Sequence, residues 1–405
     1  MTSHSSLFLC ACAPTDRYPL KEVRNEDLHS AQFRYRVQSR FAISIEPIRG
    51  VSSRALSACS AIGRESIMTK YEVIRQTIRD LGLPDYRYDQ ALDAIFKQRV
   101  KSYSDMRALP TSLRSALAER LGDSVLTVAP AAVKRSQQAE KLLFGLADGG
   151  RIEAVALRYK KGWRSYCISS QCGCACGCKF CATGASGFAR SLTADEMTDQ
   201  LLYFRMRGEP LDSVSFMGMG EPLNAPEFFD ALATLTDPRS FGLSGRRITV
   251  STVGVVPGIK RMTREFPSVN IAFSLHAPTD GQRAELMPVN RKYPLETVLD
   301  ALAEHALTTR RRVFLAYVML GGINDTAEHA RATAALLRRY KACLPLLHVD
   351  LIPYNATEHA QFRASDRRTV ELFSRMLARS GISVAVRSQF GADIDAACGQ
   401  LAART

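Results

Sequence analysis

Residues 164–184 read RSYCISSQCGCACGCKFCATG, a short apolar run followed by a loop that is dense in cysteine. This stretch holds six of the eleven cysteines in the 405-residue chain. The run RSYCIS predicts a β-strand, because short apolar or β-branched runs are typical of buried strands. The cysteine loop therefore follows the C-terminal end of a predicted strand.

Similar strands recur on both sides of this loop. IEAVALRY precedes it, and SVSFM, RITVST, VNIAFSL, VFLAYVML, LHVDLIP and ISVAVR follow it. The stretches between them predict helices: TADEMTDQLLYFRMRG, PEFFDALATL, YPLETVLDALAEHAL, TAEHARATAALLRRY and TVELFSRMLARSG. The first helix opens with a capping box, Thr193 and Glu196, and ends at Gly208. Strand–helix alternation repeated about six times predicts an α/β fold with a parallel sheet, curled into a full or partial barrel.

Polar and glycine-rich motifs lie at the ends of these strands. GMGEP (218–222) follows SVSFM, Ser251 closes RITVS, Ser274–Leu275–His276 closes VNIAF, and Asn355 follows LIPY. In a parallel barrel the C-terminal ends of the strands form one face, where ligands bind. The sequence therefore predicts one site, built from the cysteine loop and these strand ends.

Organised pattern begins near Met68. Residues 1–67 show no sustained helical or strand period, so we expect a poorly ordered extension or a start codon assigned too early. From 68 to about 150 the pattern is helical, with MTKYEVIRQTIRDLGL, YRYDQALDAIFKQRV and TSLRSALAERLG as its clearest stretches. These stretches predict a small helical domain over 68–150, ahead of the barrel over 151–405.

The composition is that of an ordinary globular protein, with 46% hydrophobic and 23% charged residues. No run approaches the roughly 18 apolar residues that a membrane helix needs, and the N-terminus lacks the pattern of a signal peptide. We therefore expect a cytoplasmic protein with no membrane partner. Thiols stay reduced in the cytosol, so a dense cysteine cluster there indicates metal binding or catalysis rather than disulfides.

The chain is strongly basic, with a net charge of +14 and a pI near 9.4. Residues 1–67 hold nine Lys and Arg against six Asp and Glu, so most of the excess belongs to the rest of the chain. A basic surface suits a polyanion such as RNA or DNA. An ordinary soluble surface with excess basic residues accounts for the charge equally well.

Within the loop, Cys174, Cys178 and Cys181 are spaced C-x3-C-x2-C. Three thiolates on one turn can hold three irons of a [4Fe-4S] cluster, whose full protein coordination takes four. The missing fourth ligand leaves one iron open, which suits a bound substrate or cofactor. Zinc is the alternative, but CxxC pairs for zinc normally come in twos, and this pair has no downstream CxxC or HxxxH mate.

C-x3-C-x2-C with an aromatic residue before the last cysteine, Phe180, resembles the signature of the radical S-adenosylmethionine (SAM) superfamily. The resemblance implies a partial (β/α)6-type barrel with one [4Fe-4S] cluster, whose open iron is chelated by the amino and carboxylate groups of SAM. One electron from the cluster then cleaves SAM into methionine and a 5′-deoxyadenosyl radical. GMGEP resembles the superfamily's glycine-rich strand-end motif, where the backbone and an acidic group meet the methionine amino group.

Longer stretches resemble the RlmN/Cfr family of radical RNA methyltransferases, from about Met68 to Leu401. They are PDYRYDQALDAIFKQR, AVALRYKKGWRSYCISSQCGC, GCKFCATG, SFMGMGEPL, STVGVVP, SLHAP, LIPYN and GADIDAACGQL. The family methylates an adenosine in the peptidyl-transferase region of 23S rRNA. RlmN acts on carbon 2 of the ring, and in some bacteria on a tRNA, whereas Cfr acts on carbon 8.

The branch within the family follows from finer details. KGWRSYCISSQCGC, FCATG and RSQFGADIDAACGQL are more like Cfr, whereas Pro222 after GMGE is at least as typical of RlmN. Carbon 8 is therefore the leading expectation, and carbon 2, with tRNA as an additional substrate, is the alternative. A protein of another class, a non-catalytic iron–sulfur or zinc protein that binds RNA, is the third reading.

The resemblance also assigns roles to two cysteines and a glutamate. The ring carbons of adenine are not nucleophiles, so the family uses two SAM molecules per turnover. The first methylates a C-terminal cysteine, matching Cys398, and radical chemistry from the second removes a hydrogen from that methyl group. A second cysteine, matching Cys167, helps remove the ring proton and resolves the protein–RNA crosslink through a disulfide. Glu153 matches an acidic residue proposed as proton acceptor.

The strand-end motifs match the family's cofactor-binding residues. These residues are Gly220, Glu221, Ser251, Ser274, Leu275, His276 and Asn355. Considered alone, His276 would be a core histidine and Cys398 a buried packing thiol. Cys172 matches the Cfr-like pattern without a role, and the remaining cysteines are expected to be incidental: Cys10, Cys12, Cys59, Cys176 and Cys343.

For RNA, we expect a basic platform on the helical domain. Its members are Lys97, Arg99, Lys101, Arg107 and Arg114. Contacts to phosphates are electrostatic, so affinity for RNA should fall steeply with salt. The target adenine must be unstacked before it can react. The resemblance further implies an electron donor of the flavodoxin or ferredoxin type, and we expect a monomer.

Overall fold

The structure is a computed structural model of the chain, and it describes residues 35–38, 42–45, 68–159, 162–356 and 362–403. The chain divides into two compact units, one of residues 16–67 and the other of 68–405 together with 1–15. In the smaller unit, β1 (Tyr35–Gln38) and β2 (Ala42–Ile45) form an antiparallel pair that the sequence pattern did not predict. The other residues before Met68, including Cys10, Cys12 and Cys59, lie outside the described residues.

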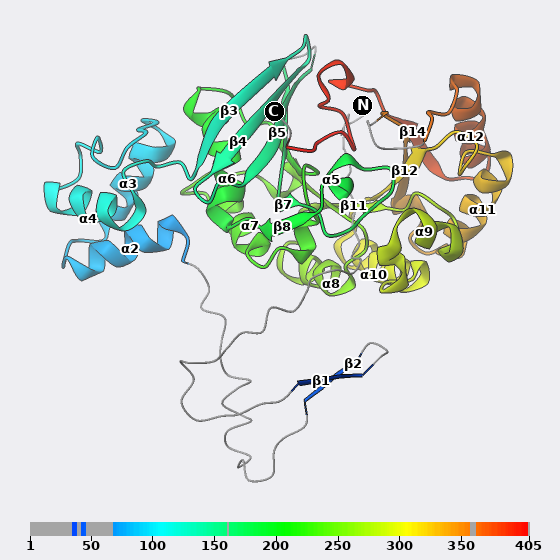
Figure 1. The fold of residues 1–405 in the computed structure, drawn as a ribbon, viewed down its shortest axis with the longest axis horizontal. Helices are drawn as coiled ribbons and strands as arrows, with labels where there is room; N and C mark the ends of the chain where they lie inside the picture. The colour runs from blue at the N-terminus through cyan, green and yellow to red at the C-terminus, as the bar shows by residue number, and fades with distance from the viewer. Residues whose placement is uncertain (1–34, 39–41, 46–67, 160–161, 357–361, 404–405) are drawn as a thin grey trace. The chain divides into compact units, whose positions relative to one another are not determined.

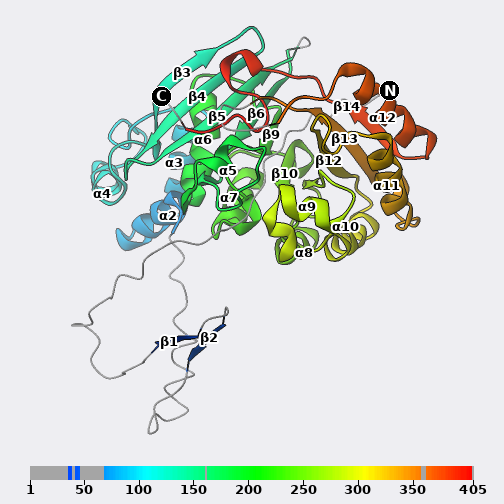
Figure 2. The same ribbon diagram turned by 45° about the vertical axis from the view of Figure 1, so that its right-hand side comes forward.

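Among the described residues of the larger unit, ten strands form one sheet (Figures 1 and 2). Seven neighbouring strands are parallel. They are β6 (Arg164–Ile168), β9 (Ser213–Phe216), β10 (Ile248–Thr252), β11 (Asn270–Ser274), β12 (Val313–Met319), β13 (Leu347–Pro353) and β14 (Ser383–Val386). These parallel strands lie where the apolar runs predicted them.

Helices connect the parallel strands, as the strand–helix alternation predicted. Figure 1 shows them following one another along the outer side of these strands. They are α6 (Ala194–Met206), α7 (Phe228–Thr236), α8 (Val256–Glu265), α9 (Asp280–Leu286), α10 (Leu295–Thr309), α11 (Ala327–Arg338) and α12 (Arg367–Arg379). The capping box at the start of α6 is present, because Thr193 accepts from the Glu196 N–H and Glu196 accepts from the Thr193 N–H. The α/β partial-barrel prediction is therefore confirmed.

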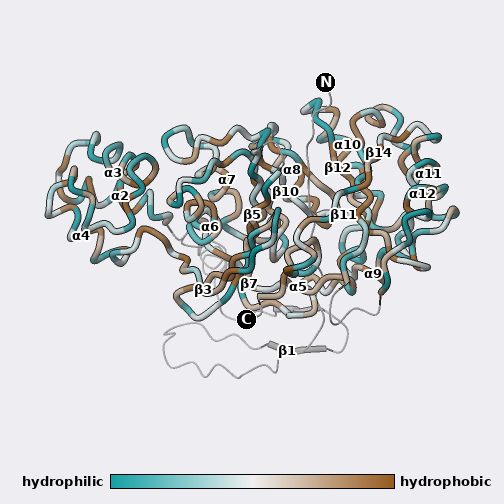
Figure 3. Tube along the Cα trace, turned by 90° about the horizontal axis from the view of Figure 1, so that it is seen from above, coloured by the Kyte–Doolittle hydropathy of each residue, from teal (hydrophilic) through white to brown (hydrophobic). Residues whose placement is uncertain are grey.

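The parallel strands form the apolar centre of this unit. Apolar residues gather in the strands (Figure 3), and every residue of β10 and β12 is buried. Such burial is expected when helices cover one face of a parallel sheet and side chains fill the other. In the part of the chain that the structure describes, no helix has the length and apolarity to cross a bilayer.

Ahead of the parallel strands, the sheet continues through three antiparallel strands. These are β3 (Val128–Arg135), β4 (Ala139–Leu146) and β5 (Arg151–Arg158). The helical prediction for 68 to about 150 therefore holds for α2 (Lys70–Asp80), α3 (Tyr86–Phe96) and α4 (Thr111–Leu121) and is wrong for β3 and β4. Seven of the eight residues of β3 are exposed, so no alternation of apolar and polar residues marks it in the sequence.

A buried ion pair fixes the first helix against the barrel. Lys70 of α2 pairs with Asp199 of α6, and both side chains are almost completely buried. The Lys70 N–H also donates to Asp195 across 2.7 Å, and the ammonium group donates to the carbonyl of Val125 across 2.9 Å. These contacts attach α2 to α6 of the barrel.

Candidate active site

The cysteine loop and the predicted strand-end motifs meet at the C-terminal edge of the parallel strands. The loop follows β6, GMGEP follows β9, and Ser251 lies near the end of β10. Ser274 ends β11, with Leu275 and His276 directly after it, and Asn355 follows β13. All five named polar and apolar side chains are buried: Ser251, Ser274, Leu275, His276 and Asn355. The residues predicted for the site therefore lie together at the C-terminal ends of the parallel strands, where ligands bind in folds of this kind.

The loop with the C-x3-C-x2-C spacing is held by a small hairpin and a close backbone approach. Strands β7 (Gln171–Gly173) and β8 (Phe188–Ser191) pair across its base. A Cβ atom on Gly173, where φ is +75°, would lie 2.1 Å from the Gly187 carbonyl oxygen, so this position requires glycine. The same carbonyl accepts from the Cys174 N–H across 2.6 Å.

The three cysteines of this spacing are withdrawn from solvent. Cys174, Cys178 and Cys181 are 1%, 2% and 3% exposed. Burial, and the charges of the neighbouring cysteines next, raise the pKa values of Cys174 and Cys178 far above their ordinary range. Thiolates so placed are unfavourable without a cation beside them, because a buried negative charge needs compensation. The donor set therefore fits a positively charged iron centre.

Among the described residues, no group of three or more His, Cys, Asp or Glu side chains surrounds a single ion position. The preference for a cluster over zinc therefore continues to rest on the C-x3-C-x2-C spacing, which has no downstream CxxC or HxxxH mate.

The GMGEP loop is locked against the cysteine hairpin by Gln171. A Cβ atom on Gly220, where φ is +100°, would lie 2.5 Å from the Gln171 Cβ, so only glycine fits. The Gln171 side-chain oxygen accepts from the Glu221 N–H across 2.9 Å. Gln171 was not among the residues predicted for the site, and only its position beside the cysteines could have suggested it.

Glu221 joins the ends of two strands. Its carboxylate accepts from the backbone N–H groups of Leu223 and Val253, at 3.2 and 3.0 Å, and it is fully buried. Burial raises the pKa of Glu221 to about 7, against the lowering effect of these hydrogen bonds and one from Thr252. A carboxylate at this position can meet a cationic amino group and gain its charged form by doing so.

His276, two residues after the end of β11, is neutral and has a left-handed backbone conformation. It has a φ of +54°, and its Nδ1 accepts from the Val318 N–H across 3.0 Å, which leaves the ring proton on Nε2. Burial, and then the charge of Arg283, lower the pKa of His276 to about 3. Its ring meets Phe180 of the cysteine loop edge to face, with 5.0 Å between the centroids.

Ser274 supplies an unpaired polar atom at the same place. Its hydroxyl oxygen is buried and has no hydrogen-bond partner among the described residues. A buried hydroxyl without a partner is unfavourable, so this position fits a group that binds through hydrogen bonds. Together with the Glu221 carboxylate, it gives the strand ends the polar groups that the amino-acid part of SAM would require.

A fully buried arginine, not predicted from the sequence, organises these strand ends. Arg283 of α9 donates to the carbonyls of Val253, Ser274 and Leu275 at 2.7 to 3.0 Å, and to the side chain of Asn290 at 2.6 Å. It thereby ties the end of β11 to the turn after β10. Nothing in the local sequence GQRAEL (281–286) distinguishes this arginine from a surface residue.

The C-terminal segment returns across the sheet and ends beside β5 (Figures 1 and 2). The Asn355 side-chain amide donates to the carbonyl of Cys398 across 3.2 Å. The Ala182 N–H donates to the Gly399 carbonyl across 2.8 Å, from the first turn of α5 (Ala182–Ala185) directly after the cysteine loop. These bonds hold Cys398 at the C-terminal edge of the barrel.

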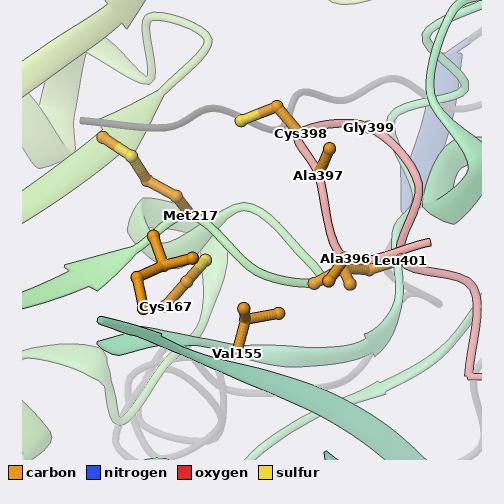
Figure 4. A pocket seen from close by; sticks show the side chains of 9 residues that line it. Val155, Cys167, Met217, Ala396, Ala397, Cys398, Gly399 and Leu401 are labelled. Carbon is orange, nitrogen blue, oxygen red and sulfur yellow. The ribbon is translucent and has the colours of Figure 1, made fainter. Parts of the chain in front are cut away.

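Cys167 of β6 and Cys398 line the same pocket (Figure 4). The other lining residues are Val155, Leu157, Met217, Ala396, Ala397, Gly399 and Leu401. Both cysteines lie in the described part of the chain, and no disulfide joins them. Burial raises the pKa of Cys167 to about 12, so this thiol is protonated at neutral pH.

Cys398 also lines a second pocket, on the side of the cysteine loop. The other residues that line it come from the cysteine loop, the ends of β11, β12 and β13, and the C-terminal segment: Phe180, Cys181, His276, Val318, Ile352, Pro353, Tyr354, Asn355 and Gly399. Cys398 thus lies between the predicted cofactor site and the pocket of Cys167. The sequence could not show this position, because the cysteine comes from the far end of the chain.

Glu153 lies on β5, two residues before the pocket residue Val155 and on the same face of the strand. It is 1% exposed, and its carboxylate lies 3.1 Å from the ammonium group of Lys141 on β4. It also accepts from the Ala402 N–H across 3.0 Å. From the sequence alone, Glu153 could also have been an ordinary surface carboxylate. That interpretation is wrong, because Glu153 is buried and each of its carboxylate oxygens has a partner inside the protein.

The predicted RNA platform is largely exposed. Lys97, Arg99, Lys101 and Arg107 are exposed, and Lys97 pairs with Asp93 across 2.7 Å. Arg114 is half-buried and donates to the carbonyl of Ser104 and the hydroxyl of Thr111. Four of the five side chains can therefore reach a phosphate, whereas Arg114 supports its own helix.

The other cysteines that the structure describes occupy packed positions. Cys172 and Cys176 are buried in or beside the cysteine loop. Cys343 is buried far along the chain, and its thiol donates weakly to the Tyr340 carbonyl across 3.6 Å. Trp163 is 42% exposed and donates to the Ser213 hydroxyl across 3.1 Å, so it is a surface residue.

Comparison with known proteins agrees with this site. Residues 168–337 match the radical SAM superfamily. The ribosomal RNA large subunit methyltransferase Cfr of Lachnoclostridium phytofermentans is 55% identical over 335 residues, which cover 82% of this chain and 97% of that protein. The enzyme of the same name from Bacillus velezensis is 49% identical over 335 residues, covering 82% of this chain and 96% of that protein.

A solved structure agrees as well. The crystal structure of a radical SAM methyltransferase from Sphaerobacter thermophilus superposes with a TM-score of 0.77 and 37% sequence identity. The superposition covers 84% of this chain and 99% of that one. The chain therefore belongs to the RlmN/Cfr family of radical SAM rRNA methyltransferases and, within it, to the Cfr-like branch.

Proposed function

We propose that this protein methylates carbon 8 of an adenosine in 23S rRNA, using SAM and a methylated Cys398 as the intermediate. The choice of carbon 8 rests on the Cfr-like stretches of the sequence. The observation that supports the methylated intermediate is the position of Cys398, which lines both the pocket of Cys167 and the pocket beside the cysteine loop. A residue that receives a group at one site and delivers it at another needs access to both. Small neighbours, Ala396, Ala397 and Gly399, leave room around it.

The residues that would hold the cofactors are those at the strand ends. Cys174, Cys178 and Cys181 would hold the [4Fe-4S] cluster. SAM would bind among Gly220, Glu221, Ser251, Ser274, Leu275, His276 and Asn355. When bound, the two groups supply a 5′-deoxyadenosyl radical close to the pocket of Cys398. His276, which lines the pocket beside the cysteine loop, is neutral and so places no charge there that would hold water.

Cys398 would act twice. Its sulfur would accept a methyl group from a first SAM molecule and release the thiol proton. Transfer of a hydrogen atom from that methyl group to the 5′-deoxyadenosyl radical would then leave a carbon radical on Cys398. This radical adds to the adenine ring, which polar methyl transfer cannot achieve because the ring carbon is not a nucleophile. The reaction requires the target adenine to be unstacked and placed in the pocket that Cys167 shares.

Cys167 and Glu153 would complete the transfer. The radical adduct must lose one electron, to a one-electron acceptor such as the oxidised cluster, and the ring carbon must lose its proton. The bond between Cys398 and the new methylene group must then be broken. Attack by the Cys167 thiolate on the Cys398 sulfur would do this: the methylene group leaves with the electron pair of the C–S bond and takes up a proton to become the methyl group, and a disulfide remains between the two cysteines. Because the Cys167 thiol is protonated at neutral pH, it must first give up its proton, and the Glu153 carboxylate on the same face of the sheet is the proposed acceptor.

The remaining partners are 23S rRNA and a reductant. Lys97, Arg99, Lys101 and Arg107 offer exposed charge to the RNA backbone. A single-electron donor of the flavodoxin or ferredoxin type would reduce the cluster, and the disulfide formed in each turnover would need reduction by a thiol. We place the protein in the cytoplasm, where both rRNA and reducing thiols are found, and as a monomer.

Mass spectrometry of the rRNA tests the choice of carbon. The gene is expressed in a host that lacks RlmN, and the rRNA fragment around the target adenosine is analysed by tandem mass spectrometry against 2-methyladenosine and 8-methyladenosine standards. We expect 8-methyladenosine, and 2-methyladenosine would overturn the choice of carbon 8. The same digestion of tRNA tests the additional substrate.

A non-catalytic iron–sulfur or zinc protein that binds RNA is the competing function. The shared pocket of Cys167 and Cys398 favours catalysis, because a binding scaffold does not require two cysteines at one pocket. Protein purified without oxygen should be brown and should cleave SAM when it is reduced. A colourless, zinc-loaded preparation that leaves SAM intact would support the competing function instead.

A further inference from the structure

One buried ion pair attaches the segment that carries Cys398 to the sheet on both sides of the cysteine. Lys141 of β4 donates to the backbone carbonyl of Asp395 across 3.1 Å, ahead of Cys398. Glu153 of β5 accepts from the backbone N–H of Ala402 across 3.0 Å, after Cys398. The ammonium group of Lys141 and the carboxylate of Glu153 lie 3.1 Å apart.

Because the pair is buried, its attraction alone contributes little net stability. The side chains of Lys141 and Glu153 are 9% and 2% exposed. Removing two charges from water costs about as much as their attraction returns, so a buried ion pair is a weak source of stability. The two hydrogen bonds to the C-terminal segment give each charge a second partner, and both of these partners belong to the same segment.

Between these two attachments, hydrogen bonds from uncharged groups reach the backbone of the segment. Asn355 donates to the Cys398 carbonyl, Ala182 to the Gly399 carbonyl, and Thr183 to the Leu401 carbonyl across 2.5 Å. Hydrogen bonds to charged groups are about twice as strong as those between neutral groups. The charged attachments at Asp395 and Ala402 are therefore the firm points, and Cys398 lies on the stretch between them.

We infer that Lys141 is a positioning residue for methyl transfer, acting with Glu153 to fix the two ends of the Cys398 segment. The inference rests on the proposed function, in which Cys398 serves both pockets. With its ends fixed at β4 and β5, the segment can shift Cys398 between the pockets without leaving the barrel. The contact with Ala402 also occupies Glu153, so the segment controls when this carboxylate is available as a proton acceptor.

A second lysine provides a matched control. Lys134 of β3 contacts the same residue, Asp395, but through its exposed carboxylate at 3.3 Å, with side chains 55% and 61% exposed. Exposed ion pairs contribute little, because water and salt screen them. Removing Lys134 deletes this exposed ion pair without touching the buried one.

Hydrogen–deuterium exchange on the cluster-loaded enzyme under anaerobic conditions tests the inference. In Lys141→Met, we expect the amides of residues 396–402 to exchange at least about tenfold faster than in the wild type, because a charge-assisted attachment is removed. Lys134→Met should exchange like the wild type. Turnover with rRNA should fall at least about tenfold in Lys141→Met with little change in KM, and Lys141→Arg should recover a large part of it.

The exchange measurement does not depend on methylation, so it separates this inference from the proposed function. Wild-type exchange in Lys141→Met would overturn the positioning role even if methyl transfer proceeds as proposed. Faster exchange would support the positioning role even if the methylated carbon proves to be carbon 2.

A variant with unpaired Glu153 can fail to fold, so a second variant is needed. The double variant Lys141→Met with Glu153→Gln removes both charges of this pair. The amide oxygen of the new glutamine side chain can still accept from the Ala402 N–H. We expect faster exchange near Asp395 and Ala396 with protection retained at Ala402. Unchanged exchange near Asp395 in this double variant would overturn the inference.

Discussion

The side-chain amide of Asn355 donates to the backbone carbonyl of Cys398 across 3.2 Å. Its side-chain oxygen accepts from Gln389 across 3.0 Å. Asn355 matches a cofactor-binding residue of the family, yet both ends of its amide contact the C-terminal part of the chain. In this conformation it links the cofactor pocket, which it lines, to the segment that carries Cys398.

The Asn355→Ala variant distinguishes these two roles. If Asn355 positions Cys398, reductive cleavage of SAM should stay within about threefold of the wild type, while methylation of rRNA falls at least about tenfold. Both rates are measured on the same anaerobic preparation, with Gln389→Ala as a milder control. A tenfold higher KM for SAM with unchanged turnover at saturation would instead make Asn355 a cofactor ligand.

Cys398→Ala and Cys167→Ala should fail at different steps. Without the Cys398 sulfur there is no acceptor for the methyl group, so we expect SAM cleavage but no methylated RNA. Without the Cys167 sulfur the bond between Cys398 and the RNA cannot be resolved, so a covalent protein–RNA species should accumulate and be visible on a denaturing gel. Cys343→Ala, a buried cysteine outside both pockets, should methylate RNA normally. RNA methylation by Cys398→Ala would exclude the intermediate.

Iron content tests the assignment of the cluster ligands. Cys178→Ala should lose most of its iron and the brown absorbance, because the proposed cluster has only three protein ligands, each on its own iron. Cys172→Ala is the matched control, since Cys172 is also buried and lies two residues before Cys174. We expect it to keep its iron by metal analysis and its visible spectrum. Loss of iron in Cys172→Ala together with retention in Cys178→Ala would reverse the assignment.

Protein stability should fall in mild acid because of His305 of α10. His305 is fully buried, its Nδ1 lies 2.9 Å from the Thr263 hydroxyl oxygen, and its Nε2 has no partner among the described residues. Burial, and then the charge of Arg311, lower its pKa from 6.5 to about 4. Above pH 6.5 the histidine is neutral in both states, and as the pH falls from 6.5 to 4 the unfolded chain binds the proton first.

The free energy of unfolding should therefore drop by about 2 kcal/mol between pH 7.5 and pH 5 on account of His305. Urea unfolding at the two pH values measures this, with His305→Gln as the comparison. His276, whose pKa is also lowered, adds a similar loss that the substitution does not remove. An identical pH dependence in the wild type and His305→Gln would show that His305 binds its proton normally in the fold.

The exposed lysine and arginine of the platform should act through their attraction to phosphates. Lys101→Glu and Arg107→Glu should weaken rRNA binding. The plot of log affinity against log salt, which has a negative slope, should become less steep by about one for each phosphate that the variant no longer binds. Arg367→Glu is the control, because this exposed arginine lies on α12, which packs against β13 and β14. Filter binding at several salt concentrations gives the slopes. Equal effects of all three substitutions would indicate non-specific attraction to the net charge.

The local pattern was sufficient for the parallel strands, their helices and the cysteine loop. A strand such as VFLAYVM or a helix that opens with Thr193 and Glu196 is specified by residues within a few positions of each other. The same holds for Cys174, Cys178 and Cys181, whose spacing lies within one turn of the chain. Strand β3 escaped prediction because it is a mostly exposed edge strand that is held by pairing with β4.

Only the tertiary structure brought Cys398 to Cys167, Gln171 to Glu221, and Arg283 to the carbonyls of two strand ends. It also showed that Glu153 is a buried partner of Lys141 and not a surface carboxylate. These pairs join residues far apart in the sequence, and a pair of this kind leaves no periodicity or spacing in the chain. The sequence by itself determined the scaffold and the spacing of the proposed cluster ligands, since both depend on residues close together in the chain. The tertiary structure decided how Cys167 and Cys398 are held, because long-range packing alone sets that geometry.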